Sequence, residues 1–557
     1  MARALIASFL GSMLAIAGLV VERLLLGTPI QAGAFGVYAV CGGVAAASTR
    51  SLAELWKSGY GARAACLATL SAMACLHLAY FANVKLLPAE PYWTPLSLSA
   101  DLVLVGLVLG VASWLLRSPR AQALRIRFGR VAAAGGLLTL ALGLGAVALE
   151  WPRSAVPISR RGDGPNLLLV VLDSARRDHL GLYGYGRPTS PEIDRWSTRA
   201  RVFTEAFSAS SWTVPSVATL MQSKGPGGPV ARRLAALGYA SACFTDNPHL
   251  HAQSRLLAGF DHVQRSVGTW RALLRGTVLG ETIERIDSGD DERLVASALR
   301  WATAQKSPVF LYVHLMDSHT PYRRSPIDGR KRGGRHVEFP STGMALSAEE
   351  AEDIAARYDG GIRSSDRAAA ALLEAVGGWG RPWLAIVTAD HGESLGEDGR
   401  WFHGGSLAPE LLGVPLLVEG TTVAPGRVDG VVGQSAVPAT LLAAAGLEPE
   451  PGAFDLRRVE RPGVAEGGLP PRLLYRVAGD YKLVFDADER RARLFNRRLD
   501  PSERRDLAAL EPQRTAALLA EVPGHEPKAV VAIPPEEVER LKALGYVVAT
   551  PEHSGSR

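Results

Sequence analysis

The stretch Trp383–Glu393, which reads WLAIVTADHGE, passes from a nearly continuous apolar run to an abrupt polar end. The breaking residues Gly380–Pro382 precede it. A short apolar run between breakers predicts a strand that is buried on both faces, as in a parallel sheet. Asp390 and His391 follow the run directly, and open α/β sheets bind ligands outside the carboxyl ends of their strands. The pattern indicates a metal site, with a solvated turn capped by Asp390 as the simpler alternative.

Two further runs have the same design, namely PNLLLVVLD at Pro165–Asp173 and VFLYVHLMDSH at Val309–His319. Three strands that each end in acids or imidazoles would bring those groups together along one edge of a sheet. Between the runs, Pro229–Leu237 and Ala348–Val376 have the amphipathic pattern of helices. Alternating strands and helices predict an α/β fold, with a mostly parallel sheet and helices on both faces.

Thr213 lies in SSWTVPSVATLMQ, two residues before the proline that starts a short apolar helix. A hydroxyl residue in this place is ordinarily an N-cap. The same geometry also suits catalysis, because a helix N-terminus attracts phosphate or sulfate. A metal held by Asp173, Asp390 and His391 could convert the Thr213 hydroxyl into an alkoxide nucleophile. Both interpretations of Thr213 stay open at this point.

Residues 1–150 differ from the rest of the chain, because they are almost free of Asp and Glu and rich in Ala, Leu, Gly and Val. Their apolar runs lie near the ~20 residues that a helix needs to cross a bilayer. These runs are 4–21, 29–47, 62–82, 98–116 and 130–150. We expect an α-helical membrane domain of about five spans over 1–150 and a linker over 151–164, although the first run alone could be a signal peptide.

The positive charges of this region predict its orientation. They gather in the second and fourth connections between the runs, at Arg50, Lys57, Arg63, Arg117, Arg120, Arg125 and Arg127. The first and third connections offer only Arg23 and Lys85. By the positive-inside bias, the second and fourth connections are cytoplasmic. We therefore expect a multi-pass protein of the cytoplasmic membrane whose soluble part is periplasmic or extracellular.

The charge pattern and the cysteine content limit the partners and the cysteine-based features of the soluble part. The net charge of +6 is spread along the chain, and its arginines are not interleaved with stacking aromatics, so we expect no nucleic-acid partner. Cys243 is the one cysteine of four outside the apolar region. An internal disulfide and a cysteine-based zinc cluster are therefore both excluded in the soluble part.

Several motifs occur together in an informative order. They are LDSARRDHLGLYGYGRPTSPEID, SSWTVPSVATLM, HLMDSHTPY, TADHGESLGEDGRWFHGG and the closing VERLKALGYV. Together they resemble the sulfatase branch of the alkaline-phosphatase superfamily over most of residues 165–450. The resemblance implies an alkaline-phosphatase-like α/β fold, a divalent metal and a covalent ester on the nucleophile. Residues 451–557 would form a small C-terminal subdomain and tail, with an antiparallel strand pair at Tyr481–Phe485 and Arg493–Phe495.

The nucleophile position selects a sub-branch of this family. Sulfatases carry a Cys or Ser that matures to formylglycine in a C/S-x-P-x-R motif, whereas this chain has Thr213 and, in place of the arginine, Val217. Threonine here is similar to the phosphoethanolamine transferases and lipoteichoic-acid synthases, which also carry about five N-terminal spans. The resemblance implies metal ligands at Asp173, Thr213, Asp390 and His391. It also implies that His319 and His403 contact the phosphoryl group or protonate the leaving group.

The chain departs from the family pattern in two places. Ser174 stands where sulfatases have a second metal-binding Asp, and a short Gly- and Pro-rich connection, Gln222–Pro229, replaces part of the usual substrate wall. The ligand set suits zinc or manganese better than calcium, which prefers an all-oxygen shell. Four further histidines are interpreted as lying outside the chemistry: His179 and His314 as structural, and His249 and His251 as loop residues.

The sequence thus predicts a membrane-anchored, metal-dependent enzyme that transfers or hydrolyses phosphoryl-type groups through Thr213. Its partners would be the lipid bilayer and a phospholipid head group, or a glycan or lipid of the cell envelope. A hydrolase of sulfuric or phosphoric esters is the first alternative. The second is a catalytically silent membrane protein that retains the fold.

Overall fold

The structure is a computed structural model that describes residues 160, 162–222, 228–251, 254–264, 291–330, 344–448, 452–469 and 472–522. All of these belong to one unit, formed by Ala155–Ser266 and Gly289–Ala532. Within these ranges, no helix combines the length and apolar character needed to cross a membrane. The predicted spans within 1–150 and the closing VERLKALGYV lie outside the described residues.

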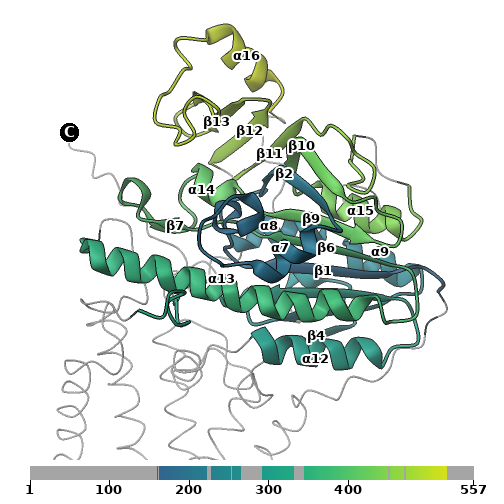
Figure 1. Ribbon diagram of the computed structural model, residues 1–557. Coiled ribbons are helices and arrows are strands. Elements are labelled where there is room, and N and C mark those ends of the chain that lie inside the picture. The colour runs from purple at the N-terminus through teal and green to yellow at the C-terminus, as the bar shows by residue number, and fades with distance from the viewer. Residues whose placement is uncertain are drawn as a thin grey trace, which may run out of the picture. The chain divides into compact units, whose positions relative to one another are not determined.

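A twelve-stranded mixed sheet forms the centre of this unit (Figure 1). In spatial order its strands are β14 (Arg491–Asn496), β13 (Tyr481–Asp486), β12 (Leu473–Ala478), β11 (Val464–Leu469), β10 (Gly426–Gly433), β2 (Arg201–Phe207), β9 (Leu416–Gly420), β6 (Trp383–Ala389), β1 (Asn166–Leu172), β5 (Val309–Leu315), β3 (Ala240–Thr245) and β4 (His262–Gln264).

The direction of the strands changes along this sheet. From β6 to β4 all neighbours are parallel, as predicted. Strand β9 is antiparallel to both β6 and β2, and β11 to β14 are antiparallel to one another. Short hairpin connections give antiparallel neighbours, whereas a parallel pair needs a long crossover. Strand β10 is parallel to both β2 and β11. The prediction of a mostly parallel sheet therefore holds for the part around β1, while β9 makes the whole sheet mixed. The antiparallel pair predicted for Tyr481–Phe485 and Arg493–Phe495 is confirmed as β13 and β14, which continue the same sheet.

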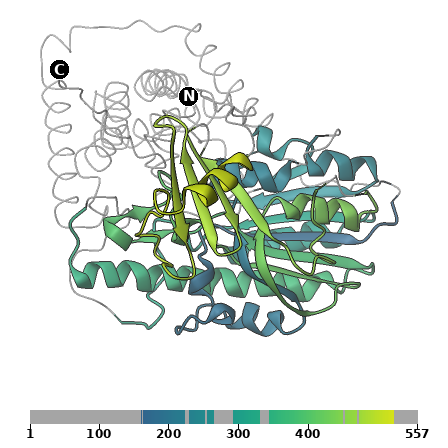
Figure 2. The same cartoon turned by 90° about the horizontal axis from the view of Figure 1, so that it is seen from above.

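Helices cover both faces of the sheet, as expected (Figures 1 and 2). One face carries α7 (Pro191–Ser197), α12 (Asp291–Thr303) and α13 (Ala348–Val376), and the other carries α8 (Thr213–Met221), α9 (Val230–Ala236) and α15 (Ala436–Ala444). The bounds of α13 coincide with the predicted helix, and a capping box of Ser347 and Glu350 begins it. Short helices α14 (Pro409–Leu412) and α16 (Pro512–Ala520) complete the set.

The register of β1 positions the functional groups. Every residue of β1 and β5 is buried, because apolar side chains alternate between two covered faces. Leu172, the last residue of β1, pairs with Leu315 of β5 and with Ala389 of β6. The residues that follow, including Asp173 and Asp390, therefore leave the sheet side by side.

Helix α13 fixes the loop that follows β5 through backbone contact. A Cβ atom added to Gly361 would lie 2.2 Å from the carbonyl oxygen of Asp317, and one added to Gly360 would lie 2.1 Å from that of Ser325. The two glycines therefore allow the loop to cross the helix directly. This loop carries His319.

We expect Gly361→Ala to lower the free energy of unfolding by roughly 1–3 kcal/mol, since the loop backbone must move to accept the methyl group. Urea denaturation measures this change. Gly377→Ala is the matched control, because its added Cβ would lie 3.6 Å from Trp383 Nε1, an ordinary contact. Equal stability of the two variants would contradict the proposed close packing.

Candidate active site

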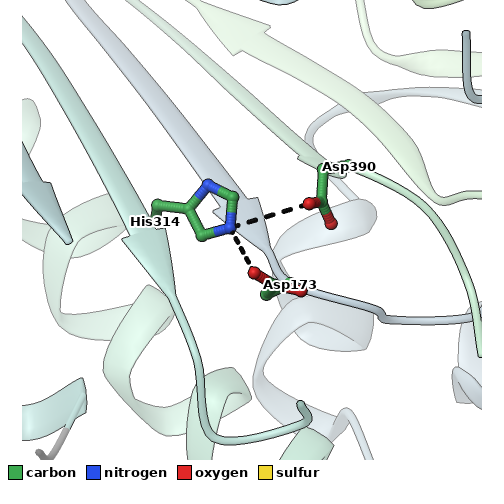
Figure 3. A group of neighbouring side chains, drawn as sticks. All are labelled: Asp173, His314 and Asp390. Carbon is green, nitrogen blue, oxygen red and sulfur yellow. Dashed lines mark hydrogen bonds and ion pairs between the residues drawn. The ribbon is translucent and has the colours of Figure 1, made fainter. Parts of the chain in front are cut away.

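Asp173, His314 and Asp390 meet where strands β1, β5 and β6 end (Figure 3). All three side chains are fully buried. His314 Nε2 lies 2.7 Å from Asp173 Oδ2 and 3.8 Å from Asp390 Oδ2. One ligand atom from each residue lies within 4.8 Å of the other two. Two carboxylates and an imidazole at this spacing form a donor set that a divalent metal can use.

Asp390 is held in place by only one of its oxygens. Oδ1 accepts the backbone N–H groups of Ser174, at 3.1 Å, and of His391, at 2.9 Å. Among the described residues no hydrogen-bond donor reaches Oδ2. Burial and the neighbouring Asp173 carboxylate raise the pKa of Asp390. A buried carboxylate oxygen without a donor is costly unless a cation satisfies it, so the residues fit a bound metal.

Asp173 has the opposite electrostatic environment. Burial acts to raise the pKa of Asp173, but the nearby His319 and the hydrogen bond from His314 hold it well below its ordinary value. Its carboxylate also accepts the Ser174 hydroxyl at 2.9 Å. Burial acts to lower the pKa of His314, yet the bond to Asp173 raises it overall. Asp390 therefore has the higher pKa of the two carboxylates, and Asp173 the lower.

Thr213 is the first residue of α8, and its hydroxyl does not cap the helix. Trp212 occupies the N-cap position, without a side-chain hydrogen bond. Thr213 Oγ1 instead lies 3.3 Å from His391 Nε2. His391 Nδ1 donates to the Gly392 carbonyl at 2.8 Å, so Nε2 carries the lone pair. The N-cap interpretation of Thr213 is wrong, and the hydroxyl faces the site.

The four residues that the resemblance implied as metal ligands thus converge on one place. His391 Nε2 lies 3.4 Å from Asp390 Oδ2 and 3.3 Å from Thr213 Oγ1. Asp173 reaches the same place through His314. Their role as ligands stays a prediction, and His314 is an additional candidate ligand.

His403 and His319 border this group. The ring centroid of His403 lies 4.3 Å from that of His391 and 4.9 Å from that of His319. Glu393 Oε1 lies 3.1 Å from His403 Nδ1. Burial and then His391 lower the pKa of His403 well below its ordinary value, while burial raises the pKa of Glu393. Both shifts favour uncharged forms, so the pair holds exchangeable protons beside Thr213 without a net charge.

Three residues of the site escaped the sequence interpretation. His314 was assigned a structural role, although its position two residues after Tyr312 in a strand puts both on one face, where they share a hydrogen bond of 2.6 Å. Glu393 was quoted as the end of a motif without a role. Asn247 follows β3, an apolar run that was not recognised as a fourth strand ending at the same edge.

The other histidines behave differently from one another. His179 lies outside this group of residues, and its Nδ1 pairs at 2.8 Å with the buried carboxylate of Asp359. His249 lies in a loop, as expected, but it is buried and its ring meets the ring of Trp212 edge-on at 6.3 Å. The loop after β3 therefore contributes to the surroundings of Thr213.

We expect Asp390→Asn to stabilise the metal-free protein by on the order of 1 kcal/mol. The Oδ1 atom of asparagine keeps both backbone hydrogen bonds, while the buried charge next to Asp173 is removed. Thermal unfolding in the presence of a chelator measures the difference. A lower unfolding temperature for the variant would contradict the proposed repulsion between the two carboxylates.

Comparison with known proteins identifies the family of the chain. The family model described as Sulfatase matches residues 165–447, just over half of the chain. A phosphoethanolamine transferase, EptA, of Helicobacter pylori is 25% identical over 264 residues, which cover 45% of this chain and 47% of the relative. The low-salt glycan biosynthesis sulfotransferase Agl7 of Haloferax volcanii is 25% identical over 297 residues, covering 51% of this chain and 61% of the relative. The chain thus spans less than two thirds of either relative.

A solved structure supports the same fold. The phosphonate monoester hydrolase of Agrobacterium radiobacter aligns with a TM-score of 0.51 and 18% identity, covering 64% of this chain and 94% of that chain. At this identity the likeness concerns the fold alone. The expected fold of the alkaline-phosphatase superfamily is confirmed as a mixed α/β sheet. The chain belongs to the sulfatase family.

Proposed function

We propose that this protein is a membrane-anchored, metal-dependent enzyme that transfers a phosphoethanolamine-type group through Thr213. The observation that carries the proposal is the Thr213 hydroxyl, which lies at the start of a helix and 3.3 Å from His391 Nε2, beside two buried carboxylates. Threonine cannot mature to formylglycine, so the chemistry of sulfate-ester cleavage in sulfatases does not apply. Similarity to a phosphoethanolamine transferase supports the choice of transferred group.

The reaction would proceed in two displacements on phosphorus. Thr213 Oγ1 gives its proton to solvent and attacks the phosphodiester, an O–P bond forms, and the bond to the diacylglycerol oxygen breaks. His403 gives the proton of its Nε2 to that leaving oxygen while the uncharged Glu393 passes its own proton to Nδ1, and the second displacement returns both protons. An acceptor hydroxyl then attacks the phosphorus of the phosphothreonine ester. The Thr213 oxygen leaves and recovers a proton, and His403 accepts the proton of the attacking hydroxyl.

A divalent metal would be held by Asp173, Thr213, Asp390 and His391, with His314 at its edge. Bound there, it would stabilise negative charge on the phosphoryl oxygens and on the nucleophile. The nitrogen ligand favours zinc or manganese over calcium. His319, whose Nε2 lies 4.0 Å from Asp173 Oδ1, would contact the phosphoryl group on the side toward β5.

We also propose that residues 1–150 anchor the enzyme in the cytoplasmic membrane, with its catalytic part on the outer side. Five apolar runs and the distribution of Arg and Lys support this orientation. An anchored active site stays within reach of lipid head groups, which suits a phospholipid donor. Extraction of membranes with alkaline carbonate tests the anchor, since a protein that leaves the membrane fraction would contradict it.

The same residues also support a hydrolase, in which water replaces the acceptor hydroxyl. A catalytically silent protein is the remaining alternative. The buried Asp390 oxygen without a donor argues against silence, because a fold kept only for binding gains nothing from a buried carboxylate oxygen that has no hydrogen bond.

We expect the wild-type protein, incubated with phosphatidylethanolamine and zinc or manganese, to gain a covalent adduct of phosphoethanolamine mass. Thr213→Ala should gain none, and Thr213→Ser should retain it, because serine keeps the nucleophilic oxygen. Intact-mass spectrometry measures the adduct. Thr219→Ala is the matched control, since Thr219 lies on the same helix but its hydroxyl donates to the Pro215 carbonyl at 3.1 Å.

The outcomes separate the alternatives. An adduct that persists in Thr213→Ala would exclude Thr213 as the nucleophile. Release of phosphate or sulfate from an aryl ester, dependent on Thr213 and without a lipid-derived adduct, would establish the hydrolase. Neither signal, together with no bound metal, would establish the silent fold.

Metal addition should stabilise the folded state. We expect zinc or manganese at a hundred times its dissociation constant to raise the free energy of unfolding by ~2.7 kcal/mol, and Asp390→Asn to lose most of this gain. Asp366→Asn is the matched control, because Asp366 is a buried carboxylate that accepts two backbone N–H groups of α7. A thermal shift equal in wild type and Asp390→Asn would contradict the assigned ligands.

A further inference from the structure

We propose that Asn247 is a positioning residue that holds the Thr213 hydroxyl and the Asp173 carboxylate in their reactive arrangement. Asn247 follows β3, whose last residue Thr245 is in register with His314 of β5. It therefore reaches the same edge of the sheet as the three strand ends described above. The proposal concerns the reaction assigned to Thr213 and rests on that proposed function.

The side-chain amide of Asn247 has a fixed orientation. Its Oδ1 accepts the backbone N–H of His249 at 2.9 Å, and only the oxygen of the amide can do so. Nδ2 must then face the opposite way, where it donates to Asp173 Oδ2 at 2.8 Å and lies 3.5 Å from Thr213 Oγ1. The side chain is 1% exposed, so water does not compete for these hydrogen bonds.

This orientation determines where the proton of Thr213 points. Nδ2 of Asn247 approaches Thr213 Oγ1 as a donor, and His391 Nε2 approaches it from 3.3 Å as an acceptor. In the protein without metal the hydroxyl hydrogen therefore points to His391, and the oxygen accepts from Asn247. A metal held by His391 would take the place of this hydrogen, and the bond from Asn247 would remain. When Thr213 loses its proton, Oγ1 becomes negative and still accepts the amide hydrogen of Asn247. This hydrogen bond therefore becomes stronger as the nucleophile forms.

An amide suits this place because it supplies donors without a charge. A lysine or a protonated histidine would bring the same hydrogens, but its positive charge would oppose a metal cation beside Asp173. Asn247 has one hydrogen for each of the two oxygens, and its own oxygen is occupied by the backbone. All of its hydrogen-bonding groups are thus assigned.

The experiment measures binding of orthovanadate, an analogue of the pentacoordinate phosphoryl group, to the full chain loaded with zinc or manganese. Isothermal titration calorimetry reports binding without turnover. We expect Asn247→Ala to weaken vanadate binding about 10²-fold and to lower kcat with little change in KM. Metal content, measured by mass spectrometry, should stay at the wild-type level.

Thr245→Val is the matched control. The Thr245 hydroxyl accepts the backbone N–H of Asn247 at 3.0 Å, so valine weakens the loop but leaves the amide in place. We expect vanadate binding within about threefold of wild type. An equal loss of vanadate binding in both variants would overturn the proposal, because Asn247 would then only stabilise the loop after β3. Recovery of vanadate binding by Asn247→Ala in excess metal would also overturn the proposal. The amide would then act only by keeping Asp173 ready to bind the metal, and not on Thr213.

Failure of this proposal can be told apart from failure of the proposed function. A loss of vanadate binding in Asn247→Ala, with no turnover of phosphatidylethanolamine by any variant, would leave the role of Asn247 intact and exclude that donor. Absence of vanadate binding to the wild-type protein would overturn both, because Thr213 would then not act on phosphorus.

Discussion

The parallel register of β1 with β5 and β6 is the constraint on which the site depends. Because Leu172 pairs with Leu315 and Ala389, two carboxylates must leave the sheet as neighbours and be buried together. Two ionised carboxylates in this position would repel each other, so the pKa of one is lowered and the pKa of the other is raised. Asp173 is kept ionised by imidazoles, while Asp390 keeps an oxygen without a donor. Burying these two carboxylates together disfavours folding, and a bound cation would compensate by interacting with both of them.

The sequence predicts the architecture of this part of the chain well, for a physical reason. Strands buried on both faces appear as uninterrupted apolar runs, and the polar residue that ends each run marks its carboxyl end. Asp173, Asp390 and His391 were found this way, and the bounds of α13 coincide with those predicted because Ser347 and Glu350 cap its start. His319 follows the third such run, and Thr213 was found at the start of a short helix; motif similarity then added His403.

What the sequence could not provide depends on side-chain direction and on distant partners. A histidine inside an apolar strand reads as a core residue, and only the pairing with Asp173 shows that His314 faces the site. Asn247 becomes informative only once β3 is known to lie next to β5. The antiparallel direction of β9 was also missed, because a hydrophobic pattern indicates that a strand is buried but not which strands lie next to it. The antiparallel pair β13 and β14 was predicted, because only a short charged turn separates the two strands.

The C-terminal strands have a consequence for how the enzyme can be divided. Strand β11 pairs with β10 of the catalytic sheet, and β12 to β14 extend the same ladder. Cutting the chain after α15 would leave β10 as an open edge, and open edges recruit strands from other molecules. A shortened protein of this kind would tend to self-associate. Strands β11 to β14 therefore protect the edge of the catalytic sheet from pairing with other chains.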